Sequence, residues 1–442
     1  MADSLFDLAG RVMDLAKKQG VDECCAGVGR ASYVSMEWRD GKLENVEEST
    51  TRGVMLRMYV DQRYSVHSIS DIRPEALAAF VADAVEMTRC LAKDPYRSLP
   101  DPALYQGRSE VDLLLGDPSR DQWTPQARID ALKTLEDAAR SVPGAERLIS
   151  VSAGVQDSSH DGVRIQSNGF QGTAQGTSFW VSAESTIHGD GDKRPAGWSS
   201  AGSRWLVDLP SPMEVGAFST RRALDQLGAR SIPSQCLPVL VEGRVAGRLA
   251  GMLLGDPLSA RALQQNLTFL AGQQGKQVGS DKLNVLDQPL VVKGFGSRLF
   301  DGEGIASRPL VLFERGVLRN YYVDTYYGRK IDMPPTTGSS SNLEWELGSR
   351  GLEEMIASIP RGVLITAFLG GNSNGLSGDF SLGVRGFLIE QGQLAHPLHE
   401  MNLGGNQLTL WSKLLEVGDD PYPYSALRCP SMLFDELQLS GS

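Results

Sequence analysis

The sequence predicts a mixed α+β protein built from two domains. Strand-like segments joined by tight turns outnumber any strand–helix–strand crossover, which favours antiparallel sheets with separate helices. At 442 residues, the chain is long for one hydrophobic core, because a domain usually holds about 100–200 residues. Glycine and proline cluster at residues 228–238, so we expect an N-terminal α+β domain over residues 1–230 and a β-rich domain over residues 231–442.

The N-terminal domain is expected to combine hairpins with helices. Apolar residues recur at three- and four-residue steps from Leu5 to Leu15, and Gly20 ends this first helix. Strands at 33–38 and 43–48 flank Asp40-Gly41, a dipeptide typical of a hairpin turn. The remaining expected elements are strands at 54–59 and 64–69, helices that begin at Pro74 and at Thr124-Pro125, strand-like sequence over 148–187, and a helix over 212–227 with a capping box at Ser211.

The C-terminal domain is expected to be mainly antiparallel β structure with short helices. Three strands, at 363–369, 379–390 and 393–403, should form one sheet, and Gln391-Gly392 should make the turn between the last two. The other expected elements are a hairpin of strands at 310–313 and 317–323, a polar loop over 333–342, a short helix over 407–415 and a last strand over 432–439.

Charge and composition exclude several classes of function. Lys and Arg total 43 against 54 Asp and Glu, a formal net charge of −11, whereas proteins that bind DNA electrostatically need a basic face. No apolar run reaches about 18 residues, so no membrane-spanning helix is expected. The first residues lack the features of a signal peptide, and the five cysteines lack zinc-finger spacing. We therefore expect a cytoplasmic protein with free thiols and no nucleic-acid or membrane partner.

One segment matches a serine-hydrolase motif literally. Residues 371–375 read G-x-S-x-G, and Asp379 and His396 follow in the chain order of an α/β-hydrolase triad. That mechanism places the serine between a strand and a helix, but the residues after this motif lead into another strand. A glycine-rich connection between strands is therefore the favoured interpretation.

The histidines are scattered. His396 and His399 lie on an expected strand, where residues three apart point to opposite faces, so they should not share a metal unless the strand is bulged. His160 and His188 flank strand-like segments and could meet in space.

A family resemblance rests on the C-terminal half. Phe368-Leu369-Gly370-Gly371-Asn372 leads into SGDFSLGVRGFLIEQG over residues 377–392, and Gly404-Gly405-Asn406 follows. This string resembles the TldD/PmbA family of peptidases. The TRGVMLRMYV strand at 51–60 is also similar to that family, and the ending Arg428–Leu433 is similar to its PmbA branch, also called TldE.

The resemblance carries an implication about zinc. TldD-type members hold zinc with an H-E-x-x-x-H helix and a downstream cysteine. Alignment on flanking glycines places Gly251, Met252 and Asp256 at the His, Glu and His positions, and Cys429 lies too late to match the cysteine. The resemblance therefore implies that this chain has no catalytic residue, no metal ligand and no cofactor of its own.

PmbA-type chains resemble the non-catalytic half of a heterodimer with a TldD-type chain. In such a complex the zinc is expected in the TldD-type partner, and the substrate is a peptide, including precursors of ribosomally made natural products. The family has also been linked to DNA gyrase modulation. A homodimer is the fallback assembly. The alternative function is a stand-alone metallopeptidase or hydrolase with an unrecognised site, using His160, His188, His396 or His399.

The glycine-rich strands around residues 372–381 are the candidate substrate groove. Proteases usually bind peptides as an added strand, and glycine lets another backbone approach closely. The alternative is that these glycines only permit a tight connection between strands. The candidate substrate-binding residues are Gly371, Asn372, Asn374, Gly378, Asp379, Phe380 and Ser381.

Overall fold

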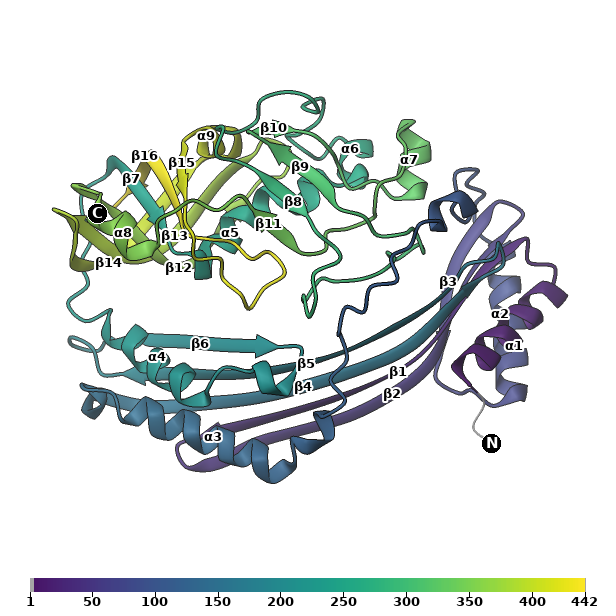
Figure 1. Ribbon diagram of the computed structural model, residues 1–442, viewed down its shortest axis with the longest axis horizontal. Coiled ribbons are helices and arrows are strands. Elements are labelled where there is room, and N and C mark those ends of the chain that lie inside the picture. The colour runs from purple at the N-terminus through teal and green to yellow at the C-terminus, as the bar shows by residue number, and fades with distance from the viewer. Residues whose placement is uncertain (1–3, 442) are drawn as a thin grey trace.

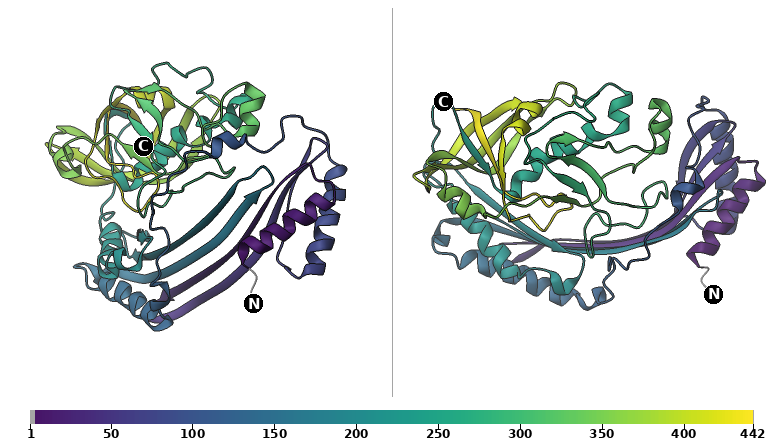
Figure 2. Two further views of the ribbon diagram at one scale, coloured as in Figure 1. Left: turned by 45° about the vertical axis from the view of Figure 1, so that its right-hand side comes forward. Right: turned by 45° about the horizontal axis from the view of Figure 1, so that its top comes forward.

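A computed structural model describes residues 4–441 and confirms the mixed α+β class. The N-terminal half is organised around a six-stranded antiparallel sheet with the order β3-β2-β1-β4-β5-β6. This sheet is long and curved, and the C-terminal half lies over its concave face (Figures 1 and 2). Its strands are β1 (Glu23–Arg39), β2 (Lys42–Val60), β3 (Arg63–Ile69), β4 (Leu148–Gln166), β5 (Gln171–Ile187) and β6 (Ala196–Ser203).

Two strands of this sheet are far longer than the sequence pattern predicted, whereas β4 and β5 together fill the strand-like range expected over 148–187. The separate strands expected at 33–38 and 43–48 are parts of β1 and β2, which hold 17 and 19 residues. Residues 42–52 of β2 are almost all exposed, and the stretch 49–53 between the strands expected at 43–48 and 54–59 shows no apolar alternation. Their structure comes from continuous pairing with β1, in which Lys42 lies opposite Arg39 and Gly53 lies opposite Gly29.

Two helix pairs cover the convex face of the sheet at its two ends (Figure 1). The first pair packs on buried residues such as Val28 and Leu56, and the second on Met36 and Val155. Ser211 caps α4 by accepting the amide of Met213 at 3.3 Å, which replaces the expected capping box. The helices are α1 (Leu5–Lys18), α2 (Pro74–Arg89), α3 (Pro125–Arg140) and α4 (Pro212–Leu224), with short 3-10 turns at Pro102–Tyr105, Arg120–Gln122, Ala145–Arg147 and Leu206–Asp208.

The C-terminal half holds a six-stranded sheet with the order β14-β13-β12-β7-β16-β15. β12, β13 and β14 pair antiparallel, as predicted, whereas β12 and β7 run parallel. β14 also pairs with β16, so five of the strands close into a ring. The strands are β7 (Gln235–Val241), β12 (Arg361–Ser373), β13 (Asp379–Glu390), β14 (Gln393–Asn406), β15 (Leu414–Val417) and β16 (Met432–Ser440).

A smaller four-stranded sheet and several helices complete this half. Helix α5 (Gly243–Leu254) is central, because Ala246, Leu249 and Leu253 are fully buried in one core with residues of both sheets. The small sheet has the order β10-β9-β8-β11. Its strands and the other helices are β8 (Val285–Asp287), β9 (Leu310–Glu314), β10 (Val317–Leu318), β11 (Leu343–Trp345), the 3-10 turn Asp256–Leu258, α6 (Ala260–Gln264), α7 (Thr325–Ile331), α8 (Leu352–Ala357) and α9 (Gln407–Ser412).

In this half, one expected strand and one expected helix are shorter in the structure than the sequence predicted. The strand expected at 317–323 stops at Leu318, because the chain then turns inward to bury Tyr322, whose hydroxyl donates to Asp287 at 2.7 Å. The helix expected over 407–415 ends at Ser412, and Leu414 begins β15. Within residues 4–441, none of the helices has the length and apolar character needed to span a membrane.

A pair of glycine substitutions tests the packing of the convex face. A methyl group at Gly216 of α4 would lie 2.1 Å from the carbonyl oxygen of Leu135 in α3, whereas one at Gly10 of α1 meets no atom within 4 Å. We expect Gly216→Ala to lower the free energy of unfolding by about 1–3 kcal/mol through overpacking. Gly10→Ala should raise it by about 0.5–1 kcal/mol, because alanine favours the helix. Urea denaturation followed by circular dichroism measures both, and a Gly216→Ala protein as stable as the parent would contradict this packing.

Candidate functional site

Helix α5 follows β7 directly, where the resemblance places a zinc-binding helix. Gly251 has no side chain, and the thioether of Met252 accepts a hydrogen bond from Gln407 at 3.7 Å. The helix ends at Leu254, so Asp256 lies beyond it, exposed and ion-paired with Arg261 at 2.6 Å. The three positions therefore offer one carboxylate that already has a cationic partner.

The residues present do not fit a zinc ion. Among residues 4–441, no group of three or more His, Cys, Asp or Glu side chains is arranged to hold a metal. Cys429 is buried, and burial raises the pKa of its thiol to about 12. Because zinc binds the thiolate form, this cysteine is a poor ligand.

The candidate histidines lie apart. His160 lies opposite Gly176 in the β4–β5 hairpin, whereas His188 comes directly after Ile187, the last residue of β5. The strand from Gly176 to Ile187 is about 36 Å long, since each residue of a strand adds about 3.3 Å. The two therefore do not meet. His399 contacts the ammonium of Lys193 at 3.1 Å, and the Nδ1 atom of His396 lies 3.0 Å from a backbone carbonyl oxygen.

The serine-hydrolase motif does not assemble a triad. Ser373 lies opposite Phe380 at the end of the β12–β13 hairpin, and no helix follows it. His396 lies opposite Leu388, eight residues farther along β13, which corresponds to about 26 Å. Residues 371–375 therefore form a glycine-rich connection between two strands, as we expected, and not a nucleophile turn.

The glycine-rich hairpin, residues 370–381, joins β12 to β13 on the surface. Gly371 has a φ of +125°, and a Cβ atom there would lie 2.2 Å from the carbonyl oxygen of Ser381. Gly378 has a φ of +81°, and its Cβ would lie 3.1 Å from the ring of Phe269. Both glycines are therefore required by the hairpin itself.

Most of the candidate side chains in this hairpin have partners within the chain. The Asn374 side chain accepts the amide of Leu376 at 2.9 Å, and Asp379 accepts from Ser377 at 2.7 Å and from Asn406 at 2.9 Å. Phe380 is buried.

Asn372 and Ser381 differ from the other candidates in this hairpin. They lie opposite each other on the two strands and are exposed. Within residues 4–441, neither side chain forms a recorded hydrogen bond. These two are the members of the candidate set that remain available to a ligand.

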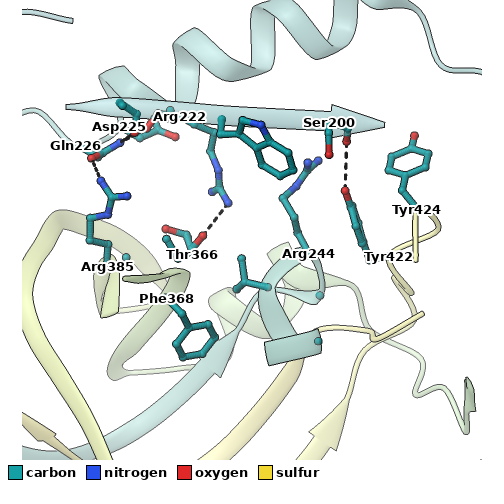
Figure 3. A pocket seen from close by; sticks show the side chains of 18 of the residues that line it. Ser200, Arg222, Asp225, Gln226, Arg244, Thr366, Phe368, Arg385, Tyr422 and Tyr424 are labelled. Carbon is teal, nitrogen blue, oxygen red and sulfur yellow. Dashed lines mark hydrogen bonds between the residues drawn. The ribbon is translucent and has the colours of Figure 1, made fainter. Parts of the chain in front are cut away.

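A pocket of about 590 Å³, here called the inter-sheet pocket, lies between the N-terminal sheet and the C-terminal half (Figure 3). One wall comes from β5, β6 and α4, and the other from α5, β12, β13 and the loop before β16. Sequence reasoning missed this pocket because its residues come from many separate segments spread over residues 180–429, and no single motif joins them. Its charged and aromatic residues include Trp198, Arg222, Asp225, Arg244, Arg385, Tyr422 and Tyr424.

Three arginines give this pocket its electrostatic character. Arg222 donates to Glu242 at 2.5 Å and to the carbonyl oxygen of Thr366 at 3.1 Å. The guanidinium of Arg244 lies 5.2 Å from the ring centre of Tyr422. Arg385 donates to the amide oxygen of Gln226, and burial together with the nearby Arg222 lowers its pKa.

Comparison with known proteins identifies the family. Models described as PmbA/TldA metallopeptidase domain 1, central domain and C-terminal domain match residues 27–88, 118–227 and 234–441. The metalloprotease PmbA of Escherichia coli O157:H7 is 28% identical over 99% of this chain and 96% of its own length.

Two solved structures share the fold. A Bacteroides thetaiotaomicron protein proposed to modulate DNA gyrase is 35% identical, with a TM-score of 0.96 over 100% of both chains. TldE from Thermococcus kodakarensis has a TM-score of 0.83 at 19% identity, over 98% of this chain and all of its own. The chain belongs to the PmbA/TldD family of metallopeptidases, in its PmbA (TldE) branch.

Proposed function

We propose that this chain is the non-catalytic subunit of a heterodimeric zinc metalloprotease that degrades or matures peptides. The observation that carries the proposal is that a member of the family, matched over 99% of this chain, has Gly251 and Met252 where zinc chemistry needs a histidine and a glutamate. The zinc is then supplied by a TldD-type partner, and this chain contributes to the walls that hold the peptide.

The stand-alone alternative has no specific observation in its favour. His160 and His188 are far apart in the described fold, and His396 and His399 engage nearby groups rather than each other. The five cysteines are free, which supports a reducing compartment, and we assign the complex to the cytoplasm.

The glycine-rich hairpin is our proposed contact with the peptide. Asn372 and Ser381 offer exposed amide and hydroxyl groups that can both donate and accept hydrogen bonds. Leu369 and Leu376 are also exposed there, 51% and 55% respectively. Exposed leucines beside free polar groups suit an extended peptide, which presents its backbone and its side chains together.

Assembly is the first test of the proposal. Mixed with a TldD-type subunit, the chain should elute from size exclusion as a complex whose light-scattering mass equals one copy of each, because related subunits pair through equivalent surfaces. Alone it should be a monomer or a homodimer. A chain that stays monomeric beside an equimolar TldD-type subunit would refute the heterodimer.

The role of the hairpin is tested by the double substitution Asn372→Ala with Ser381→Ala. We expect the complex to assemble and its peptide-cleavage rate to fall by about tenfold, which corresponds to losing roughly 1.4 kcal/mol of hydrogen bonding. Asn45→Ala, at an exposed position on β2, is the control and should leave the rate unchanged.

Gly371→Val is unsuitable for this test, because a larger residue collides with Ser381 and disrupts the hairpin. A double variant that assembles and cleaves at the parent rate would show that the hairpin serves only to connect its two strands.

A further inference from the structure

We propose that the inter-sheet pocket binds the C-terminal carboxylate of a short peptide, with Arg385 as the anchor. The pocket is complete within this one chain, so the proposal does not depend on the partner subunit. It also lies apart from the glycine-rich hairpin, since the residues that line it do not include residues 370–381.

Arg385 has no ion-pair partner among the residues that the structure describes. Its Nε atom is buried and has no hydrogen-bond acceptor among residues 4–441, and its recorded partner is the neutral side chain of Gln226. Within the described chain, no carboxylate oxygen lies within ion-pair distance of it. Arg222, by contrast, is already paired with Glu242 at 2.5 Å. Arg385 is half-buried and its Nε donor is unmet, which is costly, and a planar carboxylate matches the paired N–H groups of a guanidinium.

The pocket suits a single negative charge. Asp225 and Glu184 also line it, so a doubly charged phosphate would meet more repulsion than a carboxylate.

A second unmet donor lies toward the other end of the pocket. The Nη1 atom of Arg244 is buried without an acceptor in the described chain, and this side chain lies beside Tyr422. In Figure 3, Arg385 and Gln226 lie at one end of the pocket, while Arg244, Tyr422 and Ser200 lie at the other. Two separated donors favour a ligand with an extended backbone over a lone anion.

Strand β6 offers a peptide an open edge between these two ends. The carbonyl oxygen of Ala196 accepts from Gln226 at 2.7 Å, and that of Ser200 accepts from Tyr422 at 3.2 Å, so both point away from β5. Trp198 lies midway, and alternation along the strand points its backbone N–H and C=O the same way. A peptide can pair with the N–H and C=O of Trp198 as an added strand, since the carbonyl oxygens of Ala196 and Ser200 already accept from Gln226 and Tyr422.

The walls favour an apolar last residue. Trp198 is 56% exposed although it lines the pocket, and Phe368, Leu398 and Tyr424 lie around the same cavity. Large exposed aromatic surface beside a cation is typical of a site that binds an apolar group and a charge together.

The test measures binding to the isolated chain. The probe is a tetrapeptide, Gly-Gly-Ala-Phe, labelled at its amino end and followed by fluorescence anisotropy. Competitors are the same unlabelled peptide as acid, the same peptide as C-terminal amide, and 3-phenylpropionate. We expect the acid to bind at least tenfold more tightly than the amide, and 3-phenylpropionate to bind more weakly than the acid.

Arg385→Gln should remove the preference for the acid and leave the affinity for the amide unchanged. Arg385→Lys should retain part of the preference, because it keeps the charge but not the paired donors. Arg361→Gln, an exposed arginine on the neighbouring strand β12, is the matched control and should behave as the parent. The melting temperature of each variant shows whether its fold is retained. If Arg385→Gln melts at a lower temperature than the parent, the comparison of Arg385→Lys with the parent decides the test.

Three results would overturn the proposal. The first is equal binding of acid and amide, or no binding of either up to millimolar concentration. The second is an undiminished preference for the acid in a folded Arg385 variant. The third is binding of 3-phenylpropionate as tight as that of the peptide acid, which would assign the pocket to a free small carboxylate.

Discussion

A half-buried ion pair between Arg222 and Glu242 joins the two halves of this protein. Arg222 belongs to α4, which packs under the N-terminal sheet, and Glu242 immediately precedes α5 in the C-terminal half. The same guanidinium also donates to the carbonyl oxygen of Thr366 in β12. The end of α4, the start of α5 and strand β12 therefore meet at one cation. This contact links both walls of the inter-sheet pocket, as do the hydrogen bonds from Arg385 to Gln226 and from Tyr422 to Ser200.

The scaffold around α5 explains how the fold can persist without metal ligands. The helix is held by Ala246, Leu249 and Leu253, which are fully buried between the two C-terminal sheets. Gly251 and Met252 lie on the same helix but supply no ligand. Burial of apolar area, rather than a bound ion, therefore fixes the position of the helix. This agrees with our proposal that the chain retains the architecture of a metallopeptidase while a TldD-type partner supplies the chemistry.

Local sequence signals predicted much of the fold and little of the pocket. The hairpin turn at Asp40-Gly41 and the strands β12 to β14 were predictable because turn residues and alternation mark them. The full length of β2 was not, since the polar residues 49–53 that join its two expected parts lack a pattern, and neither was the pairing of β14 with β16. Within the glycine-rich hairpin, sequence could not separate Asn374, which closes the turn, from Asn372, whose side chain has no hydrogen-bond partner among residues 4–441.

Metal analysis of the purified chain, alone and in complex with a TldD-type subunit, tests the central claim most directly. Both samples are dialysed against zinc-containing and then zinc-free buffer and measured by elemental mass spectrometry. The account predicts no stoichiometric zinc in the isolated chain and about one zinc per heterodimer, because α5 lacks ligands. About one tightly held zinc in the isolated chain would contradict it.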